Sequence, residues 1–151
     1  MKYAEKLPVH IHYETYGDEL GVPLLLVMGL GMPLKAWPQL FIQLLVRQGF
    51  RVIIFDNRDS GKSTQINHEV RPIDVVEAIF KALTRQKIAS PYTLEDMADD
   101  ALSVLDVLGI ARAHVLGISM GGMIGQVLAT RHPQRIASLT SIMSASGNPR
   151  T

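Results

Sequence analysis

The segment 117–121, Gly-Ile-Ser-Met-Gly, constrains the fold of this chain more than any other stretch. It stands between an apolar run at 113–118, which is typical of a buried strand, and a run at 120–132 with helical spacing. The serine of the segment, Ser119, falls at the junction. The sequence therefore predicts a strand, a sharp turn and a helix, with the hydroxyl of Ser119 presented at the turn.

The neighbours of this serine fit such a turn for separate reasons. Strained backbone and closely approaching chain leave room only for small residues two positions before and after Ser119, where Gly117 and Gly121 stand. The turn also directs the amide of Met120, at the helix N-terminus, toward the place where a negative charge would develop beside the serine. A simpler interpretation, in which Ser119 merely caps a helix after a glycine-rich turn, stays open.

Strand and helix patterns alternate along the rest of the chain. Residues 9–16 alternate apolar and polar side chains, as in a half-buried strand at or near a sheet edge. Apolar runs predict strands at 24–28, 50–55, 113–118 and 136–143. Helical spacing of apolar residues predicts helices at about 37–48, 94–108 and 120–132. This alternation predicts an α/β fold, a three-layer α/β/α sandwich with a mostly parallel sheet. The loops at the carboxyl ends of the strands would then face one rim, where such sheets bind ligands.

Residues 64–91 form the least regular stretch of the sequence. Five apolar residues recur in it at helical spacing, namely Ile73, Val76, Ile79, Phe80 and Leu83. We interpret them as one extra packed helix rather than as a lid. A clearer helix follows directly, because Thr93 and Asp96 stand at the spacing of a capping box.

Composition limits the functions that this chain can have. Its 151 residues carry a formal net charge of +1, which argues against a nucleic-acid or membrane surface, and 47% hydrophobic residues suit one globular domain. The absence of cysteine excludes disulfides, thiol catalysis and zinc–thiolate sites. No metal-binding cluster or cofactor motif stands out, so we expect neither metal nor cofactor. The first residues lack the apolar stretch of a signal peptide, and we expect a cytoplasmic protein.

Three motifs follow one another in an order that resembles the N-terminal half of the α/β-hydrolase superfamily. They are the glycine loop after the 24–28 run, the segment 56–63 (Asp-Asn-Arg-Asp-Ser-Gly-Lys-Ser) and the turn at 117–122 (Gly-Ile-Ser-Met-Gly-Gly). The resemblance covers essentially the whole chain. It implies an α/β-hydrolase fold truncated after about the sixth strand, with residues 1–151 forming a single incomplete core. Residues 96–100 and the Ser-Met-Gly-Gly-Met run resemble the esterase and aclacinomycin-methylesterase-like branch.

Two residues depart from the pattern of that family. Met28 stands where the family commonly has histidine, but this side chain is not the catalytic base. Asp59 replaces a glycine of the second motif, so the sequence leaves the conformation of this local turn open.

The resemblance implies a role for each matching residue. Ser119 would be the nucleophile, and the backbone amides of Met120 and Leu30 would form the oxyanion hole. Three glycines would shape the site, namely Gly29, Gly117 and Gly121. The implied activity is hydrolysis of small-molecule carboxylic esters through an acyl-enzyme on Ser119. A serine argues against mechanisms that need a carboxylate nucleophile, while peptidase, carbon–carbon hydrolase and perhydrolase activities stay open.

The family's chain order continues from serine to Asp or Glu and then to histidine, and the present sequence lacks this second half. After Ser119 it has no Asp or Glu, and its only later histidine, His132, lies roughly 20 Å further along the helix at 1.5 Å per residue. None of the earlier histidines is marked as a general base by its sequence context; they are His10, His12, His68 and His114. We therefore expect a fragment of a longer hydrolase that is inactive alone. A chain completed by a partner and a non-catalytic binding module stay open as alternatives.

The same gap leaves the predicted strand at 136–143 near an unprotected sheet edge. We expect such an edge to promote self-association of the chain. The expected partner at the site is a small-molecule ester, with no nucleic acid and no membrane.

Two nucleotide-binding patterns compete with this interpretation. Residues 60–63 (Ser-Gly-Lys-Ser) match the end of a P-loop, but its first glycine would fall at residue 56, which is Asp56. A carboxylate there would repel phosphate. Residues 29–34 follow a strand as in a dinucleotide-binding fold, yet they lack the third glycine, and Pro33 interrupts the start of the helix.

Overall fold

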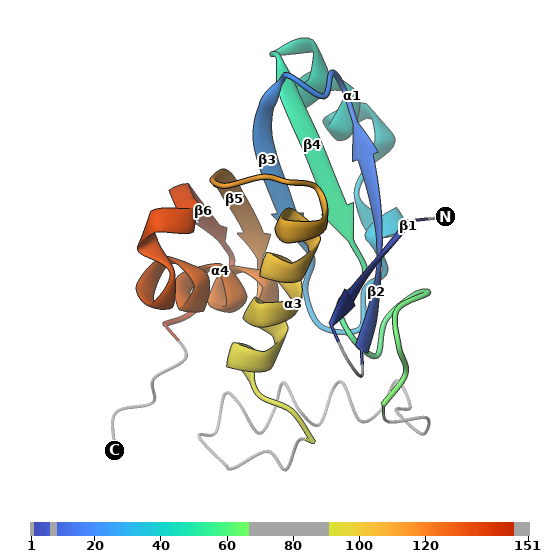
Figure 1. The fold of residues 1–151 in the computed structure, drawn as a ribbon, viewed down its shortest axis with the longest axis vertical. Helices are drawn as coiled ribbons and strands as arrows, with labels where there is room; N and C mark the ends of the chain where they lie inside the picture. The colour runs from blue at the N-terminus through green and yellow to red at the C-terminus, as the bar shows by residue number, and fades with distance from the viewer. Residues whose placement is uncertain (1, 7–8, 67–90, 147–151) are drawn as a thin grey trace.

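The computed structural model describes residues 2–6, 9–66 and 91–146, which form one six-stranded sheet with helices on both faces (Figure 1). In chain order the strands are β1 (Lys2–Lys6), β2 (Val9–Tyr16), β3 (Val22–Val27), β4 (Phe50–Phe55), β5 (Ala113–Ile118) and β6 (Ile136–Ile142). They lie side by side in the order β1-β2-β4-β3-β5-β6. The four strands from β4 to β6 are parallel, whereas β1 and β2 pair in antiparallel fashion. The mostly parallel sheet is confirmed, and the carboxyl ends of its parallel strands share one edge.

Wherever the sequence predicted a strand, the observed boundaries lie within two residues of the prediction. β4 and β5 occupy the predicted residues, β3 begins two residues early and ends one residue early, and β6 ends one residue early. β1 was not predicted. Its five residues, Lys-Tyr-Ala-Glu-Lys, are mostly charged and contain no apolar run, and only their antiparallel pairing with β2 makes them a strand.

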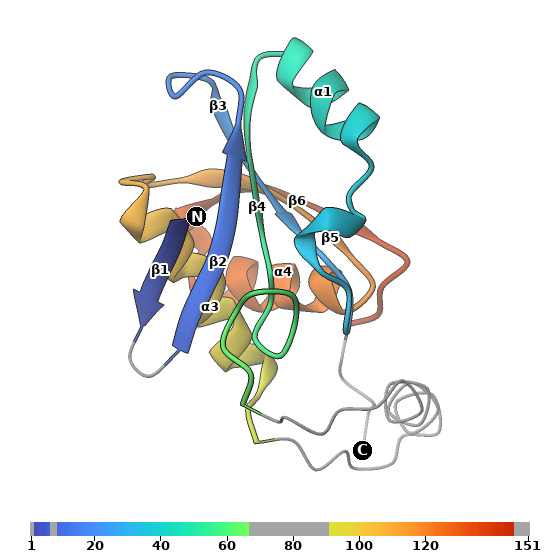
Figure 2. The same ribbon diagram turned by 90° about the vertical axis from the view of Figure 1, so that its right-hand side faces the viewer.

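Helices cover both faces of the sheet, which confirms the three-layer architecture (Figure 2). They are α1 (Gln39–Arg47), α3 (Leu94–Val107) and α4 (Met120–Arg131), together with the 3₁₀ helices η1 (Leu34–Ala36) and η2 (Pro133–Arg135). The strand β3 serves both cores, because its side chains alternate in direction. Leu25 and Val27 pack with α3 and α4, whereas Leu24 and Leu26 pack with η1 and α1. Within the described ranges, no helix is both long and apolar enough to cross a bilayer.

The helix starts follow local sequence signals. α3 begins with the predicted capping box, in which the Asp96 amide donates to Thr93 Oγ1 over 3.2 Å and the Thr93 amide donates to Asp96 Oδ2 over 2.8 Å. α1 begins at Gln39, slightly later than expected, because Pro38 occupies its N-cap. The helix predicted within 64–91 falls on residues 67–90, which lie outside the described residues.

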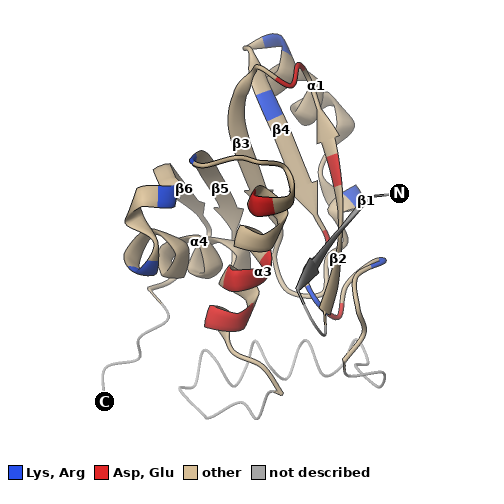
Figure 3. Cartoon of the chain, in the orientation of Figure 1, with Lys and Arg blue, Asp and Glu red and all other residues tan. Residues whose placement is uncertain are grey.

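The strand β6 forms one edge of the sheet, because β5 is its only neighbour among the described strands. Its seven residues carry no charge and no proline (Figure 3), and two apolar residues at its end are exposed, Ile142 by 37% and Met143 by 79%. Charged side chains and prolines are the usual means of preventing an edge strand from pairing with another chain. We therefore expect a protein of residues 1–151 to self-associate through β6.

Sedimentation velocity would test this expectation. We expect dimers or larger species for the unmodified protein and a monomer for Thr140→Lys, which places a charge on an exposed edge position. A monomer at all concentrations for both proteins would contradict the expectation.

Candidate active site

The backbone at Ser119 has the strained conformation that a sharp strand-to-helix turn requires. Its φ of 55° and ψ of −122° are rare for a residue with a side chain. The residue joins β5 directly to α4 and is exposed. The Ser119 amide donates to the carbonyl oxygen of Ile142 in β6 over 2.9 Å, and the Ser119 carbonyl oxygen accepts the Gly122 amide over 2.9 Å. Backbone bonds on both sides therefore hold the serine at the surface, directly after β5 and so at the carboxyl end of the parallel strands.

The two glycines that flank the turn are required by close backbone contacts. An added Cβ on Gly117 would lie 2.2 Å from the carbonyl oxygen of Gly121. An added Cβ on Gly121 would lie 2.1 Å from the carbonyl oxygen of Val27 and 2.8 Å from that of Met28. All three distances are far below van der Waals contact, and the opposing atoms are backbone. The start of α4 can therefore rest on β5 and on the end of β3 only because these positions lack side chains.

The loop after β3 borders Ser119. An added Cβ on Gly29 would lie 3.3 Å from the Ser119 Cβ and 3.8 Å from its Oγ. The loop turns back at Gly31, where φ is 68°, and the Met32 amide donates to the Gly29 carbonyl oxygen over 3.3 Å. The described part of the chain offers the Leu30 amide no hydrogen-bond acceptor. The amide of Met120, the first residue of α4, has no acceptor within its helix either. The N–H groups of these two amides are therefore available as hydrogen-bond donors, as the groups of an oxyanion hole must be.

The second motif, residues 56–63, folds around the carboxylate of Asp56, which is only 2% exposed. Its Oδ1 accepts the Leu34 amide over 2.6 Å, and its Oδ2 accepts the Lys62 amide over 2.9 Å and lies 2.9 Å from Nδ1 of His12. The amide of Lys62, which a P-loop would offer to phosphate, is thus bound to an internal carboxylate. This arrangement argues against the P-loop alternative and gives the motif a structural role.

Two further residues of this motif reach across the fold. The Asn57 side-chain amide donates to the carbonyl oxygen of Met28 over 3.0 Å. The Arg58 guanidinium forms two hydrogen bonds to the carboxylate of Asp100 in α3, at 2.7 and 2.9 Å, and lies over the ring of Tyr92 at 5.0 Å. The Arg58 and Asp100 side chains are 9% and 1% exposed, so this bidentate pair joins the β4 loop to α3 inside the protein.

Residues 22–150 match a family model described as the alpha/beta hydrolase fold. The chain belongs to the α/β-hydrolase family. This α/β hydrolase is 35% identical over 130 residues to rhodomycin D methylesterase of Streptomyces peucetius, a match that covers 86% of the chain and 37% of that protein.

Solved structures agree with this assignment. An enol-lactonase from Burkholderia xenovorans superposes with a TM-score of 0.70 at 30% identity, over 91% of this chain and 45% of that one. A hydrolase from Pseudomonas aeruginosa superposes with a TM-score of 0.71 at 32% identity, over 91% and 43%. The chain therefore spans less than half the length of each of these three relatives.

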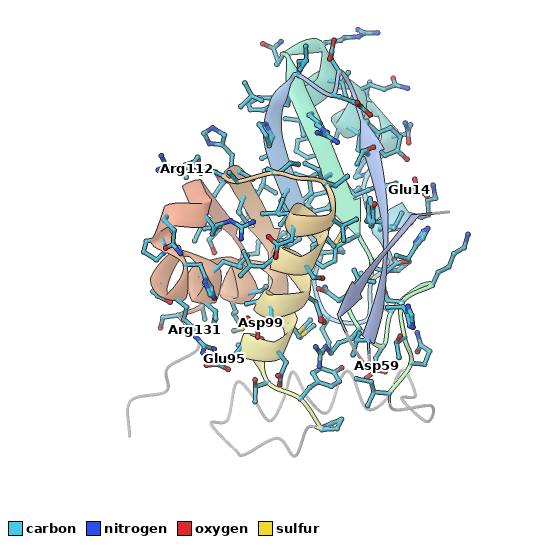
Figure 4. The ribbon with its side chains drawn as sticks, viewed as in Figure 1. Glu14, Asp59, Glu95, Asp99, Arg112 and Arg131 are labelled. Atoms are coloured by element: carbon cyan, nitrogen blue, oxygen red, sulfur yellow. The ribbon has the colours of Figure 1, made fainter. Side chains whose placement is uncertain are left out.

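Asp59 stands where the family has glycine, and it adopts the backbone conformation that glycine would have. Its φ is 60°, in the left-handed region that aspartate tolerates better than most residues. The Asp59 carboxylate accepts the Ile66 amide, and it lies in the loop below β2 and β4 in Figure 4. Burial, followed by the hydrogen bond to Asp59, raises the pKa of Tyr92 above its ordinary value. The turn is thus retained, and the new carboxylate gives it additional hydrogen bonds.

The described histidines do not supply a base for Ser119. His12 is buried beside Asp56, and His114 Nδ1 lies 2.7 Å from Ser138 Oγ. His132 follows the far end of α4, where its Nε2 lies 4.0 Å from the Asp99 carboxylate. Among the described residues, no histidine or carboxylate is hydrogen-bonded to Ser119, and His68 lies outside them. The pairing of His12 with Asp56 could not be found from sequence, because the two residues are 44 positions apart.

Proposed function

We propose that this α/β hydrolase acts on carboxylic esters of small molecules through an acyl-enzyme formed on Ser119. The observation that carries the proposal is the conformation and position of Ser119. Its backbone is strained, and the residue is exposed at the N-terminus of α4. A serine that only capped the helix would accept an amide of the first turn with its hydroxyl, and no such side-chain bond is formed at the start of α4. The alternative of a mere capping serine is therefore disfavoured.

The proposed reaction assigns one step to each group. The Ser119 oxygen attacks the ester carbonyl carbon, a carbon–oxygen bond forms, and the carbonyl electron pair moves onto its oxygen. That oxyanion would accept hydrogen bonds from the amides of Met120 and Leu30. Collapse of the intermediate expels the alcohol and leaves an ester on Ser119, which water then hydrolyses. The proton of the serine must go to a base during the attack, and the base must return it to the alcohol oxygen as that group leaves.

Among residues 2–6, 9–66 and 91–146, no histidine or carboxylate is hydrogen-bonded to Ser119. The family order puts the acid and the histidine after the serine, and the sequence after Ser119 holds no Asp or Glu and only His132. We therefore propose that both groups come from outside these residues, and that the chain without them is inactive. The same observation favours a second candidate function, a non-catalytic or partner-completed binding module.

The ester class is proposed from the relatives. One is named a methylesterase and another an enol-lactonase, and a lactone is a cyclic ester. Both names describe cleavage of a carboxylic ester bond, which is the chemistry that a serine nucleophile and an oxyanion hole support.

Labelling with a fluorophosphonate, in the presence and absence of added imidazole, tests the proposal. Imidazole in solution can take the place of a missing histidine as the base. We expect one adduct per chain by intact mass with imidazole, and labelling about 10²- to 10⁴-fold slower without it, the usual contribution of a general base.

Two variants complete this experiment. Ser119→Ala should not label, whereas Ser141→Ala, which removes an exposed serine of β6, should label as the unmodified chain does. A lack of any adduct with imidazole, or an adduct that persists in Ser119→Ala, would overturn the proposal and favour the binding module.

A further inference from the structure

We infer that Asn57 is a positioning residue, whose side chain holds the loop carrying the Leu30 amide against the Ser119 turn. The catalytic meaning of this inference rests on the proposed function, but the placement of the loop can be tested without activity. Asn57 belongs to the second motif and lies in the loop after β4, whereas Leu30 lies in the loop after β3. The two loops are neighbours because β3 and β4 pair in parallel.

The orientation of the Asn57 side chain is fixed by its partner. The Met28 carbonyl oxygen, 3.0 Å away, can only accept a hydrogen bond, so the side-chain amide nitrogen must face it. Asn57 is 3% exposed, and among the described residues its Oδ1 has no hydrogen-bond partner. A buried amide that satisfies only its donor side is costly to the fold. Within the described ranges, the bond to Met28 is therefore the one hydrogen bond of the Asn57 side chain.

The loop is held at both ends by adjacent residues of the second motif. At its start, Asn57 holds the Met28 carbonyl oxygen, and at its end the Asp56 carboxylate accepts the Leu34 amide over 2.6 Å. Between these anchors, the hydrogen bond from Met32 to Gly29 is long, at 3.3 Å. The position of the loop therefore depends on its anchors more than on its own hydrogen bonds.

The anchored carbonyl lies directly beside the serine turn. An added Cβ on Gly121 would be 2.8 Å from the Met28 oxygen, and the next residue, Gly29, approaches the Ser119 side chain. Leu30 follows one residue later. A displacement of the Met28 carbonyl would thus move the Leu30 amide relative to Ser119, and oxyanion stabilisation depends steeply on such distances.

Two substitutions of Asn57 and a control from the same loop test the inference. Asn57→Leu keeps the branched shape and the number of side-chain heavy atoms but removes the donor, and Asn57→Asp places a carboxylate oxygen opposite the Met28 oxygen. Ser60→Ala is the matched control, because Ser60 is also buried, at 5% exposure, and its hydroxyl has no partner among the described residues.

Hydrogen exchange measured by mass spectrometry gives the first readout. We expect amides of the segment 29–34 to exchange roughly tenfold faster in both Asn57 variants, the effect of losing one buried hydrogen bond, with α3 unchanged. Ser60→Ala should match the unmodified chain. Unchanged exchange in the loop would overturn the inference, and so would faster exchange throughout α3, because that would indicate general unfolding rather than local displacement.

The second readout compares 4-nitrophenyl acetate with its thiono analogue, in which sulfur replaces the carbonyl oxygen, with imidazole present. Sulfur accepts hydrogen bonds weakly, so a displaced oxyanion hole should lower kcat/KM about 10²-fold for the ester and much less for the thionoester. Equal losses for both substrates would overturn the positioning role. If the unmodified chain cleaves neither substrate, the proposed function fails, and hydrogen exchange alone decides the inference about Asn57.

Discussion

Gly121→Ala should destabilise the fold by at least about 3 kcal/mol, the upper end of the usual cost of overpacking. The added methyl group would lie 2.1 Å from the Val27 carbonyl oxygen and 2.8 Å from that of Met28. Both atoms belong to backbone at the end of a central strand, so no side-chain rotation can relieve the contact. Either α4 must move away from the sheet or β3 must shift, and either change would displace Ser119. Urea denaturation followed by circular dichroism would measure the loss in the free energy of unfolding.

Gly125→Ala provides the matched control in the same helix. Its added methyl group would lie 2.6 Å from Cδ1 of Leu139, the far end of a flexible side chain that can rotate away. Replacing glycine by alanine inside a helix also gains about 1 kcal/mol of helix propensity, which offsets part of the strain. We expect a change within about 1 kcal/mol for this variant. Equal losses for the two variants would contradict the assignment of the cost to the backbone contact at Gly121.

Asp56→Ala should cost at least about 3 kcal/mol, because each of the three buried groups that lose this acceptor is left unsatisfied at a cost of about 1–3 kcal/mol. The buried carboxylate accepts two backbone amides, from Leu34 and Lys62, and pairs with His12. Alanine would leave all three groups without this acceptor inside the protein, and each unsatisfied donor retains its desolvation cost. The loops after β3 and β4 would also lose one of the two residues that join them, and only the Asn57 bond to Met28 would remain of this pair of contacts. The free energy of unfolding from urea denaturation is again the measurement.

Asp106→Ala is the appropriate comparison for Asp56→Ala. The Asp106 carboxylate accepts a hydrogen bond from the Arg135 guanidinium at 2.6 Å, but its side chain is 60% exposed. Surface ion pairs contribute about 0–1 kcal/mol, so this variant should remain near the stability of the unmodified chain. A similar loss of stability for both substitutions would show that burial is not the reason why Asp56 contributes to the free energy of unfolding.

Much of the fold follows from local sequence signals. The apolar runs predicted β4 and β5 at their observed boundaries, and Thr93 with Asp96 predicted the start of α3. These signals are reliable because strand alternation and helix capping depend on residues within a few positions of one another. β1 escaped prediction for the opposite reason, since it is a strand only through pairing with β2.

The candidate site likewise has a part that local sequence signals predict and a part that they do not. The turn around Ser119 is a local feature, and its two glycines mark it in the sequence. The partners of the second motif are remote: Asn57 contacts Met28 at a separation of 29 residues, and Arg58 contacts Asp100 at a separation of 42. Neither contact could be predicted from the sequence, because the partners lie far apart along the chain.

The sequence by itself determined where the chain changes from strand to helix and which serine stands at the turn, because glycine spacing and hydrophobic periodicity act over short distances. Only the tertiary structure decided what surrounds that serine. Parallel pairing of β3 with both β4 and β5 brings three loops to one edge of the sheet. This pairing turns Asp56 and Asn57 into the anchors of the loop that carries Leu30, since a hydrogen bond depends on distance in space and not on distance along the chain.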